Sequence, residues 1–407
     1  MKAYRFLMIA AIFMATSLAV MTGCEYDVAQ PQWEKDYQAP PTPRITQIEP
    51  AQAKAGVNTI TIRGQNFGGV PNTNGVYFDN VPAEIIEKSA TAITVRRPNL
   101  VTDACTVKVV SDSALVVAKF GPYRIDPVLA RYGSFLDNVP LGAIAVDNAE
   151  NLYVVNGDTS YRISKVTPGG QNVRFGRATR IPTDARIANG YLVLLSRNRQ
   201  IERMDLATGV VTQWVQLASG KSVAFGDFDA AGYFYAGGRN TDLMIIAPDL
   251  TSKAAGIYPS GNEIMAVRVF SGYVYVAVRV IRTSPRDTTT AIWRHSIGAG
   301  GNLGAKELVL DMKATGRFAS RTIRALTFAA DGTMYIATDS PDPILIFDPK
   351  TNNVDFFYKN ILPSYCKQFY WGTGNYLYLI RGDTALQQEW TVYRVDMGTT
   401  GAPYYGR

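Results

Sequence analysis

A repeated strand pattern in the last two-thirds of the chain restricts the possible folds more than any other feature. Six segments place a small or turn residue before a run with β-type alternation, and they begin at residues 151, 190, 232, 272, 332 and 375. Their spacings are 39, 42, 40, 60 and 43 residues. A second strand-forming run follows each segment, and most are also preceded by one, such as "GAIAVD" before residue 151. Each unit therefore supplies three or four strands.

Units of about 40–45 residues with this strand content are typical of the blades of a β-propeller. Because one blade cannot bury both of its faces, neighbouring blades must stack around a common axis. Six units fill residues 127–407, which predicts a six-bladed ring. The alternative, an unclosed stack of sheets, would leave long exposed edges. Insertions in the fourth unit, "RTSPRDTTT" and "GAGGNLGAKE", explain the longest interval. The region resembles the NHL class of six-bladed propellers.

Residues 44–125 form a separate predicted β module. Short alternating runs recur between turn signals, and their spacing favours a small β-sandwich. The stretches "ITQIEPAQAKAGVNTITIRGQNFG" and "VYFDNVPAEIIEKSATAITVRRP" resemble the IPT/TIG family of immunoglobulin-like domains. We expect Gly64 and Gly68 to flank a turn that needs positive φ, and Phe67 to plug the core. The resemblance implies a fold rather than an activity, because such domains serve as spacers, dimerisers and binding modules.

The predicted fold class is therefore all-β: a small immunoglobulin-like β-sandwich followed by a six-bladed β-propeller. The composition agrees, since 47% of the residues are hydrophobic and 18% are charged, which provides a core and excludes a disordered chain. The 35 glycines, 23 tyrosines and 17 phenylalanines suit strands and turns better than helical bundles.

The N-terminus carries an export signal. Two basic residues precede an apolar stretch from Phe6 to Met21, and polar sequence follows it. The run Met21-Thr22-Gly23-Cys24 resembles a lipobox, where bacterial lipoproteins are cleaved and acylated on the cysteine, although Met21 replaces the usual leucine. The alternative is an ordinary signal peptide with an incidental cysteine.

Residues 1–23 are accordingly expected to be a lipoprotein signal peptide, and residues 24–43 a flexible, proline-rich tether lipidated at Cys24. Several acyl chains on one cysteine anchor a protein stably. The expected location is the outer membrane, lipid-anchored and exposed at the cell surface. The sequence leaves the leaflet open, because the acidic pair after Cys24 only leans toward the exterior.

The net charge of +7 is unevenly distributed. Between Arg162 and Arg203, eight arginines and one lysine face only Asp184 and Glu202, which gives +7 over 42 residues. Two interpretations stay open: a solvated outer face of the first two blades, or a docking face for an anionic ligand, an acidic partner or lipid headgroups. Export argues against nucleic acid as the partner.

The chain is poor in groups for catalysis or metal binding. One histidine, His295, and three cysteines argue against a His/Cys metal site, and any Ser-His-Asp arrangement would have to be built on His295. Cys105 and Cys366 are expected to be small buried hydrophobes. No catalytic residue, metal site or cofactor is predicted. Three carboxylates near inner strands were weighed as cation ligands, but their spacing favours structural turns: Asp184, Glu263 and Asp339.

Propellers bind at one end of the axis, through loops that enter the innermost strand and loops between the second and third strands. In these loops Arg and Asp are suited to hydroxyl groups, and aromatic side chains to sugar faces; the alternative for each residue is a structural role. The candidate ligand-binding residues are Arg197, Arg199, Arg239, Asn240, Arg282, Arg324, Asp339, Tyr365 and Arg381, with Trp293, Trp371 and Trp390 beside them.

The order of a lipobox, a proline-rich tether, a TIG-like module and a propeller resembles surface lipoproteins of Bacteroidota. That resemblance implies a non-enzymatic protein that binds an extracellular oligosaccharide, or a peptide, and works with a TonB-dependent transporter and its lid lipoprotein in nutrient uptake. A propeller hydrolase or lyase acting on an extracellular polymer is the alternative, and it requires a carboxylate cluster and a metal at the axis. A structural subunit of a surface complex, docked through the arginine-rich blades, is the second alternative.

Overall fold

The computed structural model describes residues 41–68, 74–111, 116–281, 290–382 and 389–406 of the 407-residue chain. The expected signal peptide, the lipidation site Cys24 and most of the tether lie outside these ranges, as do Arg282 and nearly all of the first insertion of the fourth unit. No helix within the described ranges is long and apolar enough to cross a membrane.

The first module is a sandwich of two antiparallel four-stranded sheets, with strand orders β1-β2-β6-β5 and β4-β3-β7-β8. Alternation along β2 sends Ile60 and Ile62 into the core, where they meet Val76 and Phe78 of β3. The strands are β1 (Arg44–Glu49), β2 (Thr59–Gln65), β3 (Asn74–Phe78), β4 (Val81–Pro82), β5 (Ile85–Lys88), β6 (Ala92–Arg96), β7 (Thr102–Ser111) and β8 (Ala118–Ile125).

The turn after β2 holds Phe67 as expected, because this ring is fully buried in the sandwich core. Gly68 has a φ of 72°, in the left-handed region that favours glycine. The expectation of positive φ was wrong for Gly64: it is needed for close approach instead. A Cβ there would lie within 2.0 Å of the carbonyl oxygen of Arg44 and 2.4 Å of the Phe67 ring.

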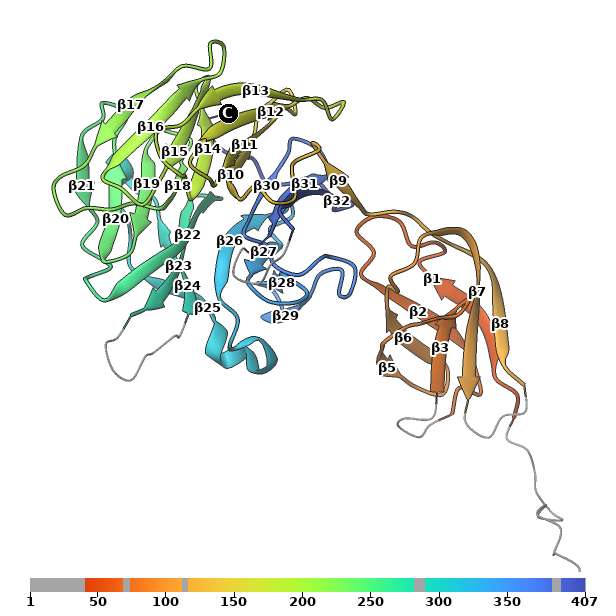
Figure 1. The fold of residues 1–407 in the computed structure, drawn as a ribbon. Helices are drawn as coiled ribbons and strands as arrows, with labels where there is room; N and C mark the ends of the chain where they lie inside the picture. The colour runs from red at the N-terminus through yellow and green to blue at the C-terminus, as the bar shows by residue number, and fades with distance from the viewer. Residues whose placement is uncertain (1–40, 69–73, 112–115, 282–289, 383–388, 407) are drawn as a thin grey trace, which may run out of the picture.

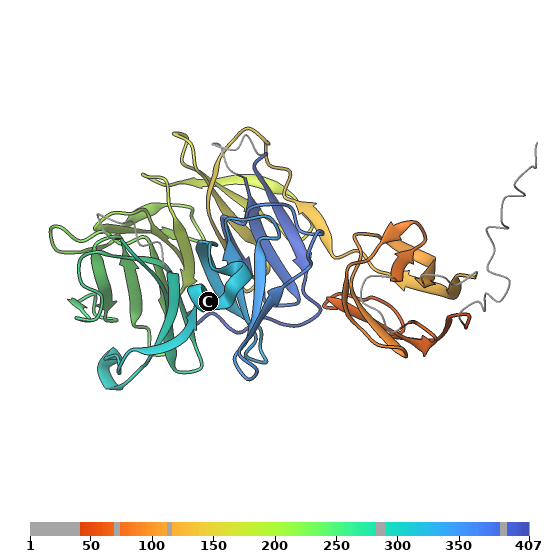
Figure 2. The ribbon, with the colours of Figure 1, turned by 90° about the horizontal axis from the view of Figure 1, so that it is seen from below.

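The second module is a ring of six antiparallel four-stranded sheets, which confirms the six-bladed propeller (Figures 1 and 2). Blade one has β10 (Leu141–Val146), β11 (Leu152–Asn156), β12 (Arg162–Val166) and β13 (Asn172–Arg177); blade two has β14 (Asp184–Ala188), β15 (Tyr191–Leu195), β16 (Gln200–Asp205) and β17 (Val211–Gln216). Blade three has β18 (Phe225–Phe228), β19 (Phe234–Gly238), β20 (Thr241–Ile246) and β21 (Ser252–Ala254); blade four has β22 (Asn262–Phe270), β23 (Tyr273–Val280), β24 (Thr290–Ser296) and β25 (Glu307–Asp311). Blade five has β26 (Ile323–Phe328), β27 (Met334–Thr338), β28 (Ile344–Asp348) and β29 (Asn353–Phe356); blade six has β30 (Gln368–Trp371), β31 (Tyr376–Arg381), β32 (Thr391–Asp396) and the earlier strand β9 (Leu129–Tyr132).

The six repeated segments of the sequence are the second strands of the six blades, β11, β15, β19, β23, β27 and β31. Burial falls from the axis outward. Every residue of the inner strand β10 is buried, whereas the outermost strand β13 has none buried. The inner strands are buried on both faces because each packs against neighbouring inner strands as well as its own blade. In blade four, the second insertion contains the short 3-10 helix η1 (Ala299–Gly301); a second one, η2 (Met312–Phe318), follows β25.

The ring is closed by pairing the two ends of the propeller segment. Strand β9 precedes blade one in the chain but pairs antiparallel with β32, so Val392 lies opposite Tyr132 and Val395 opposite Leu129. Blade six is therefore assembled from both ends. This pairing covers the edge that β32 would otherwise expose.

The sandwich is docked on blade five and its following loop (Figures 1 and 2). Arg96 of β6 forms two hydrogen bonds with Asp355 of β29, at 2.8 and 3.1 Å. The side chain of Asn58 donates to the carbonyl of Phe356 and accepts from the N–H of Tyr358, and Gly56 N–H donates to the Tyr358 hydroxyl. Two modules joined by this many direct contacts are held in one relative orientation.

Arg96 is 5% exposed, so its charge is compensated by protein partners rather than by water. Burial alone would raise the pKa of Asp355, but the hydrogen bonds and charges of Arg96 and Arg317 hold it below its ordinary value. A second pair, Lys359 with Glu84 at 2.8 Å, lies at the rim of the same interface. The ion pair with Arg96 is thus strongest where Asp355 is ionised.

We predict that Arg96→Met lowers the free energy of unfolding by about 2 kcal/mol, because it leaves Asp355 partly desolvated without its main partner. Urea unfolding measures the loss, and small-angle scattering should show a wider range of distances between the modules. The matched control is Arg63→Met, which breaks an exposed pair with Glu49 on the same sheet and should cost less than about 1 kcal/mol. Equal effects of the two substitutions would show that the docked interface contributes nothing.

Candidate functional site

The axis of the ring is occupied by a buried ionic network on the inner strands of blades two, three and four. Arg186 donates to Asp184 at 2.6 Å and to Asp227 at 3.2 Å, and Arg268 donates to Asp227 at 2.9 Å. All four side chains are less than a tenth exposed. Since two positive and two negative groups alternate, each charge removed from water has an opposite partner.

The end of the described chain seals one end of this axis. Arg268 donates to the carbonyls of Ala402 and Pro403, and its guanidinium lies 3.7 Å from the centre of the Tyr404 ring. Tyr404 is stacked on Tyr370 of β30, with ring centroids 4.1 Å apart. The tail thereby links the inner strands of blades four and six, which are separated by blade five.

The three carboxylates weighed as cation ligands are held by three different arginines. Burial raises the pKa of Asp184 to about 6, against the pull of Arg186. Glu263 of β22 pairs with Arg279, and Asp339, after β27, pairs with Arg324 at 3.0 Å. They stand on separate blades, and within the described ranges no three His, Cys, Asp or Glu side chains are placed to share a metal ion. The axis therefore carries an arginine–aspartate network where the enzyme alternative requires a carboxylate cluster.

His295 is a structural residue of blade four. It is fully buried, and its Nε2 lies 2.7 Å from the Tyr258 hydroxyl while its Nδ1 lies 3.2 Å from the Gly304 carbonyl. Burial lowers the pKa of His295.

Cys105 and Cys366 are buried free cysteines, as expected. Burial also raises the pKa of both thiols, so neither is an activated nucleophile.

Eight of the nine candidate ligand residues fall in described segments, and Arg282 does not. Arg324 and Asp339 meet as an ion pair, and Arg381 lies 3.8 Å from Glu389. The remaining five are placed as follows: Arg197 and Arg199 are exposed between β15 and β16, Arg239 and Asn240 are exposed between β19 and β20, and Tyr365 is half-buried before β30. Of the accompanying tryptophans, Trp371 and Trp390 are buried and Trp293 is half-buried under Lys306.

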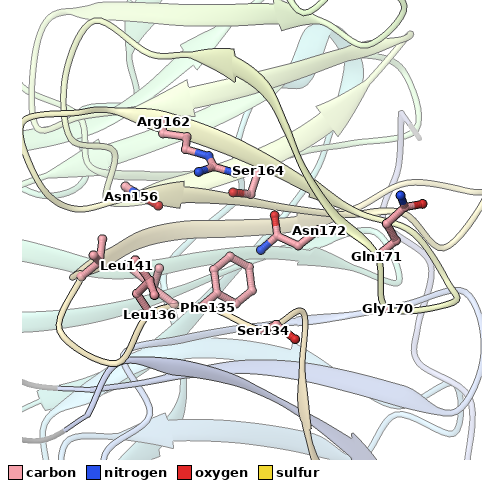
Figure 3. A pocket seen from close by; sticks show the side chains of 11 residues that line it. Ser134, Phe135, Leu136, Leu141, Asn156, Arg162, Ser164, Gly170, Gln171 and Asn172 are labelled. Carbon is pink, nitrogen blue, oxygen red and sulfur yellow. The ribbon is translucent and has the colours of Figure 1, made fainter.

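A separate cavity of about 410 Å³ lies between blade one and the segment that joins β9 to β10 (Figure 3). We call it the seam cavity; eleven residues line it, and none of them is among the candidates above. Its volume is within the range of small-molecule sites, roughly 300–1,000 Å³. One wall carries Phe135 and Leu136, and the other carries Arg162 and Ser164 of β12 with Asn172 of β13.

Strand geometry explains this wall. Arg162 and Ser164 are two residues apart on β12, so they project from the same face. Asn172 lies opposite Val166 in the cross-strand register, which brings it to the same side. The facing wall depends on Gly133, whose φ is 83° and whose missing side chain leaves room for Phe135: a Cβ there would lie 2.6 Å from that ring.

Two side chains of the cavity lining each have a polar atom that is buried without a hydrogen-bond partner among the described residues. These atoms are Nε of Arg162 and Oδ1 of Asn172. The amide of Asn172 is oriented by its nitrogen, which donates to the Gly133 carbonyl at 2.6 Å, so the oxygen is directed elsewhere. Unsatisfied buried polar groups are rare in native proteins, and these two belong to side chains that line the same cavity.

The seam cavity could not be predicted from the sequence. The basic run from Arg162 to Arg203 was the available signal, but the structure divides its members among several roles. Arg186 joins the axial network, Arg203 stacks on Tyr191, and Arg162 enters the cavity. The sequence pattern did not reveal the pairing of β9 with β32, and this pairing brings residues 133–140 against blade one.

The fold and these sites define an all-β protein in which an immunoglobulin-like domain is docked on a six-bladed propeller. Residues 43–122 match the family described as IPT/TIG domain, which agrees with the resemblance in the sequence.

One curated relative is a cyclomaltodextrin glucanotransferase from Bacillus sp. (strain 1-1), 30% identical over 117 residues. The match covers 28% of this chain and 15% of that enzyme, so the chain spans only a small part of the relative's length.

Solved structures cover much more of the chain. An auxiliary nutrient binding protein from Bacteroides thetaiotaomicron superposes with a TM-score of 0.50 and 11% identity, covering 88% of this chain and 99% of that one. A luciferin-regenerating enzyme superposes with a TM-score of 0.53 and 13% identity, covering 69% and 98%. At such identities the likeness establishes the fold alone, and the fold is shared by binding proteins and enzymes.

We predict that Asp227→Asn lowers the free energy of unfolding by about 3–5 kcal/mol, because it leaves Arg186 and Arg268 buried with an uncompensated positive charge. Urea denaturation followed by tryptophan fluorescence measures the change. Asp249→Asn, in an exposed turn where the carboxylate bonds only to Thr251, is the matched control and should have little effect. If Asp227→Asn is equally neutral, the axial network is not a source of stability.

Proposed function

We propose that the protein is a lipid-anchored cell-surface binding protein that captures an extracellular oligosaccharide in the seam cavity and works with a TonB-dependent outer-membrane transporter in nutrient uptake. The observation that carries the binding role is the composition of the cavity. An aromatic ring faces hydroxyl, amide and guanidinium groups across a space large enough for a small ligand. Sugars are recognised by this combination, since a ring contacts their apolar C–H face and polar groups bond their hydroxyls.

Binding is favoured over glycoside hydrolysis because of what lines the cavity. Hydrolysis of a glycosidic bond uses two carboxyl groups on either side of the bond, roughly 5–10 Å apart. The residues that line the seam cavity include no Asp or Glu. The axial carboxylates are engaged with arginines, as described above. A hydrolase or lyase built on the seam cavity would therefore lack its acid and base.

The transport role rests on two supports outside the cavity. A solved auxiliary nutrient binding protein from a Bacteroides species superposes on 88% of this chain. The lipobox-like run at Cys24 supplies the means to hold the protein at a membrane. A peptide in place of an oligosaccharide, and a purely structural role in a surface complex, are separate outcomes of the experiments below.

We predict that Cys24→Ser prevents acylation and moves the protein from the membrane fraction to the soluble fraction. Metabolic labelling with a fatty acid and fractionation of cells measure both effects, and protease treatment of intact cells tests surface exposure. Purification of the wild type from membranes should recover a TonB-dependent transporter. A wild-type chain without label, or one protected from protease until cells are lysed, would refute the proposed location.

We also predict that Phe135→Ala weakens oligosaccharide binding about tenfold, because the ligand loses the apolar wall of the cavity. A glycan array of the unacylated Cys24→Ala chain identifies ligands, and calorimetry measures their affinity with and without the substitution. Phe175→Ala is the matched control, since Phe175 is also half-buried on blade one but packs on Tyr153 away from the cavity. Binding to peptides alone, or to a recovered partner protein with no glycan affinity, would transfer support to the other candidates.

A further inference from the structure

We propose that the seam cavity selects acidic saccharides, with a carboxylate or sulfate group of the sugar seated on Arg162. This inference rests on the proposed function, because it names the class of oligosaccharide for the same cavity. Three features of the cavity support it: the uncompensated charge of Arg162, the polar and aromatic groups around it, and the charge of the surrounding surface.

Arg162 is a half-buried cation with no ion pair in the part of the chain that the structure describes. Other arginines of the propeller that are largely buried have carboxylate partners, as Arg186 and Arg268 do on the axis. Nε of Arg162 is buried without any acceptor, and the cavity lining holds no Asp or Glu. A planar guanidinium in that position is matched best by an anion with two oxygens in a fork, such as a carboxylate.

The repeat provides an internal comparison for this position. Cross-strand registers make Lys165 of blade one equivalent to Arg203, Arg294 and Arg394 in other blades, and these cations stack on aromatic rings of their own blades. Arg162, three residues earlier, has no such ring contact. The corresponding residues of the other five blades are Gln200, Asp242, Ala291, Pro343 and Thr391. The propeller fold therefore does not require a cation there, and blade one alone has it.

A simple anion would satisfy Arg162 but would make no use of the other polar side chains of the lining, such as Ser164. Sugar hydroxyls can form hydrogen bonds with such groups. Phe135 on the facing wall offers a surface for the apolar face of a sugar ring. A saccharide that carries an acidic group meets all three requirements in one ligand.

The outer surface of blade one has the same sign of charge. Arg174 lies opposite Ser164 and Arg177 opposite Arg162 in the pairing of β12 with β13, and both are exposed. The nearby acid Asp158 is bonded to Ser160, and Asp137 of the facing segment is paired with Arg131. The mouth of the cavity thus draws anions toward Arg162, by an attraction that salt screens.

The test compares each acidic oligosaccharide with a neutral form of the same oligosaccharide. The Cys24→Ala chain is titrated with oligosaccharides that contain uronic acids and with the same oligosaccharides after carboxyl reduction, beside sulfated and neutral panels, at low and high salt. We expect carboxyl reduction or desulfation to lower affinity by about tenfold to a hundredfold, the range of a charged hydrogen bond. Salt should weaken the acidic ligands and leave the neutral ones unchanged.

Arg162→Met should reproduce this loss for the acidic ligand and have little further effect on the reduced one, because the two changes remove one interaction. Arg162→Lys keeps the charge but loses the two-pronged guanidinium, so its affinity for the acidic ligand should lie between those of the wild type and Arg162→Met. This variant replaces Arg162→Met in the test if the methionine variant folds poorly, which thermal melting checks. Arg174→Met is the matched control, since it removes an exposed charge from the next strand and should change affinity less than about threefold.

The outcomes separate the two claims. Equal binding of the acidic and neutral forms, or an undiminished affinity in Arg162→Met, overturns the selection for acids and leaves oligosaccharide capture standing. No binding to any glycan overturns the proposed function together with this inference. Loss of affinity on carboxyl reduction that is absent in Arg162→Met supports both.

Discussion

The propeller depends on the hydrogen bonds between β9 and β32. The end of the chain supplies only three strands of the last sheet, and a four-residue strand from the start of the segment is added as its outermost strand. The same pairing fixes where the chain must cross to begin blade one. Because residues 133–140 make that crossing, the closure of the ring also builds one wall of the seam cavity. The pairing of β9 with β32 therefore determines both the closure of the propeller and the position of the seam cavity.

Local patterns were sufficient for the architecture. The second strands of all six blades and the immunoglobulin-like domain could be predicted, because each has its own alternation and turn residues and needs no knowledge of distant contacts. The strand β9 could not, since "LARY" is short and its partner lies some 260 residues away in the sequence. The axial network escaped notice for a related reason: Asp184, Asp227 and Arg268 meet only when three blades are stacked.

The candidate site could be predicted less well than the fold, because it too depends on contacts between residues far apart in the sequence. Nine residues were expected at one end of the axis because blade loops converge there, and of the eight that the structure describes Arg324 and Asp339 form an ion pair with each other. The basic run was a real signal, but a charge count cannot tell an arginine stacked on tyrosine from one left without an acceptor. That distinction depends on which chain segment faces each side chain, and hence on ring closure. Functional residues of a repeat protein are best sought where one unit departs from its siblings.

The docking of the immunoglobulin-like domain has a mechanical consequence. Arg96, buried against Asp355, ties the domain to blade five, so no hinge separates the two modules at their junction. A displacement applied near Arg44, where the first strand begins, is therefore passed on to the propeller through this interface. The direction in which the seam cavity opens follows the orientation of the immunoglobulin-like domain.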